Sequence, residues 1–314
     1  MTLLQHRNFS ARLRSGLFAF FFAPMSLVFL GSSMVDVQAL AAVGQPLASV
    51  EGLIGMALAS LLLALIALNC EESSAGMVVT FAWSIAVGVA QLAGVARIPL
   101  LMRSSVGSSD MGAADMFAGV LWCMYPVCLS LMLGACALTI KSVRVRVGKE
   151  TRMPLARVHR HAFGTTVAIP AAIAAGFLMI VAAPSDSTNV AAMGLEGVLA
   201  TYTTPPWFAL AAALALALVA VSARWSITGA QVAAWIVLVL PAYVVLPVWA
   251  SLTGNVIVPG TSIITRIALA SPPLAALGMA TGCASLGVFW ARLRAAKIRD
   301  SAAESTANEG PAGN

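Results

Sequence analysis

The sequence has few charged residues and lacks the short motifs of common enzyme classes. Charged residues make up 10% of its 314 residues, whereas soluble globular domains have roughly a quarter. It contains no GxSxG, HExxH or GxxxxGK[ST] string, the patterns of nucleophilic, zinc-dependent and phosphate-binding sites. The composition excludes an ordinary soluble domain. Without a catalytic motif, we predict no enzyme activity, no catalytic residue and no cofactor.

Cysteine and histidine are also scarce, and their spacing does not favour a metal site. The five cysteines form no CxxC pair, and the three histidines, His6, His159 and His161, all lie in basic segments. A disulfide framework or a zinc site needs closely spaced ligands. We therefore predict no metal, and we interpret the cysteines as small apolar packing residues.

Long apolar runs are abundant. Hydrophobic residues make up 60% of the chain, and the mean hydropathy is +0.92. Because a hydrocarbon core about 30 Å thick is crossed by roughly 20 apolar residues in a helix, we predict an all-α polytopic integral membrane protein with eight transmembrane helices. The predicted spans are residues 17–35, 48–68, 76–95, 116–140, 162–183, 206–222, 227–250 and 267–290.

The distribution of lysine and arginine predicts the orientation of the spans. Fifteen of the eighteen lie before the first span, between the fourth and fifth, between the sixth and seventh, or after the eighth, and only Arg97, Arg103 and Arg266 lie on the other side. The positive-inside rule places the richer side, and hence both termini, in the cytoplasm. These basic residues flank helices where lipid headgroups lie, so we predict membrane lipids as partners and no nucleic-acid binding.

The spans and basic segments divide the chain into five parts. We predict a basic cytoplasmic N-terminus (residues 1–16), a first four-helix half (17–140), a basic cytoplasmic loop (141–161), a second four-helix half (162–290) and a disordered cytoplasmic tail (291–314). The first apolar run also resembles a secretory signal. Its length and the spans that follow favour an uncleaved first helix.

Two similar strings suggest that the halves are a duplication. DVQALAAVG begins at Asp36 and DSTNVAAMG at Asp186, and each is followed by Glu-Gly, at Glu51 and Glu196. Both strings follow the first span of their half, so the two copies have the same topology and form a parallel 4+4 repeat. The alternative is chance similarity in an alanine-rich sequence.

The four acidic residues of these strings are our candidate site residues. Asp36, Glu51, Asp186 and Glu196 are predicted to lie at the outer mouth of a pathway between the halves, although solvated loop carboxylates have the same pattern. Gln91 is the most interior amide of the spans, a position typical of either a bond between helices or a ligand contact.

Prolines within the last two spans are predicted to interrupt the helices. Pro241 and Pro247 lie in the seventh span, and Pro272 and Pro273 lie in the eighth. A proline has no N–H to donate, so each frees a backbone carbonyl. Such interruptions line binding cavities in transporters, but kinked helices are also ordinary in membrane bundles.

These features favour a permease-like protein with its pathway between the two four-helix halves. The alternative is a non-transporting scaffold or regulator of envelope machinery, because spans without ionisable residues at mid-depth need not conduct anything polar. We expect a plasma-membrane location in a bacterium, since alanine-rich spans with arginine preferred over lysine are typical of high genomic GC content. Other membrane proteins are possible partners, and the sequence identifies no small-molecule substrate.

Overall fold

The computed structural model describes residues 3–42, 45, 47–71, 73–92, 127–147, 157–183, 207–253 and 263–308. Every regular element in these residues is a helix. The all-α prediction is therefore confirmed for the part of the chain that is described. In chain order the helices are α1 (Leu3–Ala42), α2 (Val50–Leu68), α3 (Ala75–Leu92), α5 (Val127–Val147), α6 (Arg157–Ala182), α9 (Trp207–Ser222), α10 (Ile227–Gln231), the π-helix η2 (Val232–Val245), α11 (Leu246–Thr253) and α12 (Ile263–Asn308).

Six of the described helical segments are long and apolar enough to cross a membrane. They lie in α1, α2, α5, α6, the α10–η2 segment and α12, whereas α3 and α9 are apolar but shorter. At 1.5 Å per residue, the 16 residues of α9 extend about 24 Å, less than a typical hydrocarbon core. Pro205 and Pro206 precede α9 and disfavour its extension. The structure thus supports a multi-pass membrane protein, and it does not confirm all eight predicted spans.

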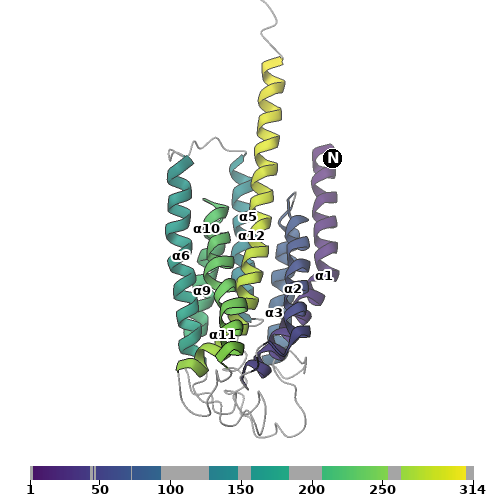
Figure 1. Cartoon of the computed structure of the whole chain (residues 1–314). Helices are drawn as coiled ribbons and strands as arrows, with labels where there is room; N and C mark the ends of the chain where they lie inside the picture. Colours follow the sequence, from purple (N-terminus) through teal and green to yellow (C-terminus); the bar gives the residue numbers. More distant parts are fainter. Residues whose placement is uncertain are drawn as a thin grey trace, which may run out of the picture.

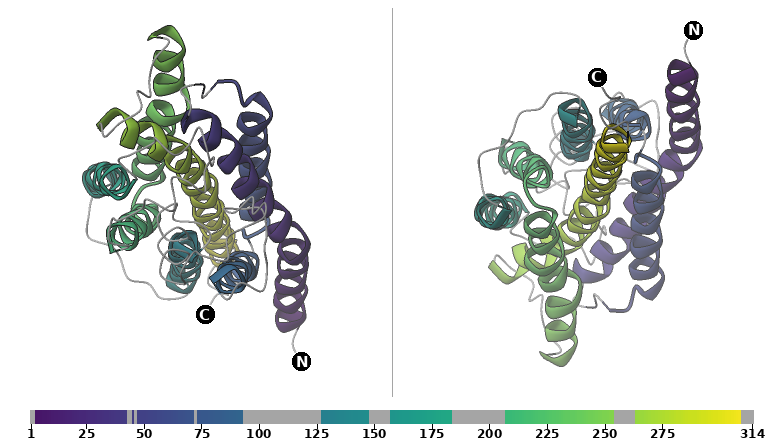
Figure 2. Two further views of the ribbon diagram at one scale, coloured as in Figure 1. Left: turned by 90° about the horizontal axis from the view of Figure 1, so that it is seen from below. Right: turned by 90° about the horizontal axis from the view of Figure 1, so that it is seen from above.

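The helices form one bundle around α12. Figure 1 shows them roughly along a common axis, and Figure 2 shows α12 in the middle with the other helices around it. In α12, 83% of the most apolar window is buried, against 33% in the corresponding window of α6. Small residues line much of its buried surface, including Ala276, Ala280 and Ala284. They allow neighbouring backbones to approach closely.

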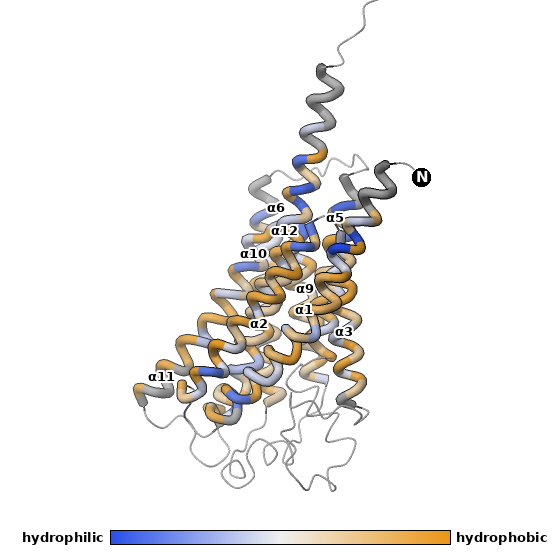
Figure 3. Tube along the Cα trace, turned by 90° about the vertical axis from the view of Figure 1, so that its right-hand side faces the viewer, coloured by the Kyte–Doolittle hydropathy of each residue, from blue (hydrophilic) through white to orange (hydrophobic). Residues whose placement is uncertain are grey.

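Basic residues gather at one end of the bundle. The beginnings of α1 and α6 and the ends of α5 and α12 lie together there, which we call the basic end (Figures 1 and 3). The contact from Arg292 Nη1 to the Ala223 carbonyl oxygen, 3.4 Å, joins the end of α12 to the turn after α9. Arg266 lies at the opposite end, where its Nη1 donates to the Val181 carbonyl oxygen at 2.7 Å.

The first and last helices of the chain extend beyond their predicted spans. The first span was expected to end at Val35, but α1 continues to Ala42. We expected disorder from residue 291, whereas α12 continues as a helix to Asn308 and projects beyond the bundle (Figure 1). The extension is rich in alanine, arginine and lysine, which have high helix propensity. It can therefore form a helix although it has no apolar face to bury.

The helices of the two predicted halves, α1–α5 and α6–α12, share part of their packing. In the first, α1 packs along both α2 and α3, while α2 and α3 contact each other only slightly. In the second, α6 packs along both α9 and the α10–η2 segment, and α9 makes only slight contact with α10. Across the halves, α12 packs against α2 and α5 packs against α9. One extensive contact, between α12 and α1, has no counterpart between α5 and α6 among the described residues.

Candidate functional site

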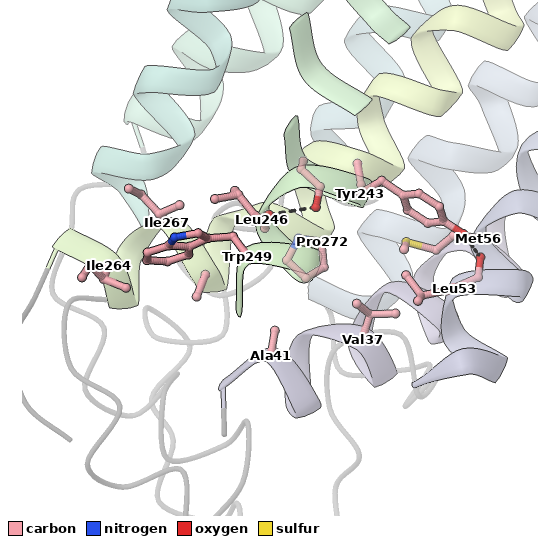
Figure 4. A pocket seen from close by; sticks show the side chains of 14 residues that line it. Val37, Ala41, Leu53, Met56, Tyr243, Leu246, Trp249, Ile264, Ile267 and Pro272 are labelled. Atoms are coloured by element: carbon pink, nitrogen blue, oxygen red, sulfur yellow. Dashed lines mark hydrogen bonds between the residues drawn. The ribbon is translucent and has the colours of Figure 1, made fainter. Parts of the chain in front are cut away.

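A cavity of about 230 Å³ lies between helices of the two predicted halves, toward the end opposite the basic end, and Figure 4 shows its lining. One wall comes from α1 and α2, and the other from η2, α11 and the first turns of α12. We call it the interhalf cavity. It is lined by Val37, Ala41, Leu53, Met56, Ala242, Tyr243, Leu246, Trp249, Ile264, Ile267, Ala268, Ser271, Pro272 and Ala275.

The two hydroxyl groups in the lining both donate to backbone carbonyls. Tyr243 Oη donates to the Leu53 carbonyl oxygen at 2.9 Å, so it links η2 to α2 across the cavity. Ser271 Oγ donates to the Ala242 carbonyl oxygen at 3.0 Å and links α12 to η2. Because the hydroxyl hydrogens are used in these bonds, the wall presents mainly hydrocarbon and aromatic surface.

Prolines explain why the carbonyls of Ala242 and Leu269 need side-chain donors. In the π-helix η2 the Leu246 N–H donates to the Pro241 carbonyl oxygen, so the Ala242 carbonyl would next pair with residue 247. Residue 247 is proline and has no N–H, and Ser271 takes its place. Gln38 of α1 does the same for α12. Its Nε2 donates at 3.0 Å to the carbonyl oxygen of Leu269, which would otherwise pair with the N–H that Pro273, four residues later, does not have.

Gln38 is the polar residue that sequence reasoning missed. Its side chain is fully buried, and its Oε1 has no hydrogen-bond partner among the described residues. It follows Val37, which lines the interhalf cavity. The sequence contains the signal, an amide two residues after Asp36, but the predicted first span ends at Val35 and leaves Gln38 outside it.

The predicted outer carboxylates are only partly within the described residues. Asp36 and Glu51 are both exposed, and neither lines the cavity. They lie near the same contact between α1 and α2, because a Cβ added to Gly52 would sit 3.0 Å from the Ser33 carbonyl oxygen and 2.8 Å from Val37 Cγ2. Asp186 and Glu196 lie outside the described residues, so the pairing of the two acidic strings stays a prediction.

A second polar cluster lies nearer the basic end. Gln231 Nε2 donates to the Gly282 carbonyl oxygen at 2.8 Å and to Ser285 Oγ at 2.7 Å, and its Oε1 accepts from Trp235 Nε1 at 2.7 Å. The whole amide of Gln231 is therefore used in holding α10 and η2 to α12. The other candidate amide, Gln91, lies in α3, and its side chain is outside the described residues.

The described cysteines fit a packing role. Cys70, after α2, is fully buried, its Sγ lies 3.8 Å from Ser15 Oγ, and burial raises the pKa of its thiol. A protonated, inaccessible thiol is a poor nucleophile and a poor metal ligand. Within the described residues, no three His, Cys, Asp or Glu side chains lie close enough together to hold a metal ion.

Comparisons of the chain with protein-family models, curated proteins and solved structures gave no match. The features that bear on function are therefore the interhalf cavity, the proline-interrupted helices around it and the charge distribution of the chain.

Proposed function

We propose that this chain is a permease-like membrane protein whose pathway runs between its two four-helix halves. The supporting observation is the interhalf cavity, because its walls come from both halves and would separate if the halves moved apart. A pocket at the junction of two helix groups is a common position for a ligand site.

The packing of the two halves supports a parallel duplication. In each predicted half the first segment packs along both the second and the third, and the first and third approach closely through glycine at the basic end. A Cβ on Gly76 would lie 3.1 Å from the Ser15 carbonyl oxygen, and a Cβ on Gly229 would lie 2.7 Å from the Gly164 backbone. In our proposal these two contacts are equivalent, and the halves are related by an axis along the membrane normal.

We place the basic end in the cytoplasm of a bacterial plasma membrane, following the positive-inside rule. The interhalf cavity then lies in the outer half of the bundle. Asp36 and Glu51, with Asp186 and Glu196 from the second string, would surround its outer mouth. Their negative charge would raise the local concentration of a cationic or proton-bearing solute.

The proline-interrupted wall supports a change of shape at the cavity. The carbonyls of Ala242 and Leu269 each accept a hydrogen bond from one side chain of another helix. When the helices separate, only these side-chain bonds have to break at the two points, and no backbone hydrogen bond within a helix is lost. Irregular helix geometry of this kind is tolerated in membranes where it lines a cavity.

A cavity-filling variant tests the proposal. Ala268→Phe adds a ring to the cavity wall, and Ala174→Phe adds the same ring to the exposed face of α6. In cells with matched protein levels, uptake or efflux across a panel of labelled lipophilic solutes should fall in the first variant and be unchanged in the second. Equal transport in both variants, or none with the wild-type chain, would argue against a permease.

The outer carboxylates need their own comparison. Replacing Asp36 and Asp186 together by Asn should weaken transport of cationic solutes more than that of neutral ones, because only the former are attracted by the charge. If the two classes change equally, the proposed outer mouth is wrong.

The projecting part of α12 favours a second candidate function, a membrane scaffold or regulator. Ala291 and Ala295 of α12 are still buried in the bundle, but the helix continues to Asn308, and a partner protein can bind this last part without any transport. Truncation after residue 298 separates the two functions. A scaffold would lose its partner or its phenotype, while a permease would continue to transport.

A further inference from the structure

We infer that the interhalf cavity binds one hydrocarbon chain of a bilayer lipid, which enters sideways from the membrane. This inference concerns binding alone. It holds whether the protein is a permease or a scaffold, because it depends only on the wall, the opening and the depth of the cavity.

The wall selects an apolar ligand. Among the described residues that line the cavity, the Tyr243 phenol is the only ionisable side chain, and it donates to the Leu53 carbonyl oxygen. A polar ligand would lose its hydration here without gaining hydrogen bonds, at a cost of several kcal/mol. Apolar cavities of roughly 150 Å³ stay dry and accept hydrocarbon ligands, and this cavity is larger.

The rim of the cavity continues into a lipid-facing surface. Trp249 and Ile264 line the cavity, yet 44% and 39% of their surfaces are exposed. Beside them, Leu252 and Ile263 are 81% and 63% exposed. In a bilayer such side chains contact acyl chains, so a chain can slide from the surrounding lipid into the cavity without crossing a polar barrier.

The depth of the cavity matches one leaflet. Its lining runs along α12 from Ile264 to Ala275, which is eleven residues and about 16 Å at 1.5 Å per residue. One leaflet contributes about half of the ~30 Å hydrocarbon core. A lipid anchored by its headgroup at the outer surface would therefore place one tail along the cavity while its other tail stays in the bilayer.

Photo-crosslinking in proteoliposomes tests the inference. The full-length chain is reconstituted in phosphatidylcholine vesicles that contain a phosphatidylcholine with a diazirine at the end of one acyl chain, and adducts are mapped by mass spectrometry. We expect adducts on Ala242, Ser271 and Ala275, which are buried and line the cavity. Exposed Phe177 of α6 should be labelled as an internal reference.

A matched pair of variants shows whether the adducts come from the cavity. Ala275→Phe fills its deep end, and Ala174→Phe adds a ring on the exposed face of α6. Labelling of Ala242 and Ser271 should be lost in the first variant and kept in the second, while Phe177 is labelled in both. Adducts confined to exposed residues in the wild-type chain, or wall adducts that persist in Ala275→Phe, would overturn the inference. If Ala275→Phe does not fold, the positions of the adducts in the wild-type protein decide the outcome by themselves.

The source of the bound acyl chain is tested by repeating the reaction with a free fatty acid that has the diazirine at the same position. Labelling of the wall by the phospholipid supports a bilayer lipid. Labelling by the fatty acid alone would overturn that assignment. Adducts on the cavity wall of a protein that transports nothing would support this inference and contradict the proposed permease function.

Discussion

Two glutamines, Gln38 buried and Gln231 half-buried, show how differently the two ends of the bundle are built. Toward the basic end, Gln231 uses both parts of its amide, with two donated bonds and one accepted from Trp235. Near the cavity, Gln38 donates one bond to α12 and leaves its carbonyl oxygen without a partner among the described residues. Both amides hold a neighbouring helix to α12, but only one is fully satisfied.

The packing of the helices also differs between the two ends. Toward the basic end, a Cβ on Gly282 would lie 2.6 Å from Trp235 Nε1, and one on Gly287 would lie 3.1 Å from the Ala67 carbonyl oxygen. At the other end α1 and α2 also pack closely, since a Cβ on Gly52 would lie 2.8 Å from Val37 Cγ2, but about 230 Å³ is left unfilled between these helices and the wall formed by η2, α11 and α12. We conclude that the basic end fixes the arrangement of the helices, and that rearrangement requires less energy at the cavity end.

The largest effect is expected from Gly229→Ala at the basic end. The added Cβ would lie 2.7 Å from the Gly164 carbonyl carbon and oxygen and 2.8 Å from the Thr165 nitrogen. Backbone atoms cannot rotate away, so α6 and α10 must separate. Overpacking of this kind costs about 1–3 kcal/mol, and we expect the upper end in the free energy of unfolding, measured by denaturant titration in mixed micelles.

Gly176→Ala is the matched control for that variant. Its Cβ would meet only Leu238 Cδ2, at 3.8 Å, an ordinary contact. The stability should change by less than about 0.5 kcal/mol. Similar stabilities for the two variants would show that the basic end is not tightly packed.

The sequence predicted the apolar helices better than the contacts between them. The predicted spans 48–68 and 206–222 nearly coincide with α2 and α9, because run length and flanking polar residues are local properties. The predicted end of the first span, Val35, was wrong because Asp36, the first acidic residue of the sequence, does not end α1. The helix continues along a neighbouring helix. The bond from Gln38 joins residues 231 positions apart, and no local pattern identifies such a partner.

Gln231→Leu is expected to have the next largest effect. It removes two donated bonds and leaves Trp235 Nε1 without its acceptor. Hydrogen bonds between helices in membranes contribute about 0.6 kcal/mol on average and up to about 1.7, so we expect a loss of about 1–2 kcal/mol. A double-mutant cycle with Trp235→Phe measures the part due to that pair. A coupling energy near zero would contradict the proposed network.

A smaller effect is expected from Ser271→Ala at the cavity. The change leaves the Ala242 carbonyl oxygen without the donor that replaces the N–H missing at Pro247. We expect a loss of about 0.6 kcal/mol, the average for such bonds in membranes. Thr281→Val is the control, because Thr281 Oγ1 donates to the Leu277 carbonyl oxygen of its own helix and ties no second helix. If both variants lose equal stability, the carbonyl of Ala242 does not depend on Ser271.

The smallest effect is expected from Gln38→Leu, and this variant tests the comparison between the two ends most directly. Leucine removes the bond to the Leu269 carbonyl oxygen, which is unfavourable, but it also removes a buried Oε1 without a described partner, which is favourable. An unsatisfied buried polar atom costs about as much as a hydrogen bond contributes, so the two changes should nearly cancel. We expect the free energy of unfolding to change by less than about 0.5 kcal/mol. Since both glutamines are replaced by the same residue, a loss for Gln38→Leu as large as that for Gln231→Leu would show that the cavity end is held as firmly as the basic end.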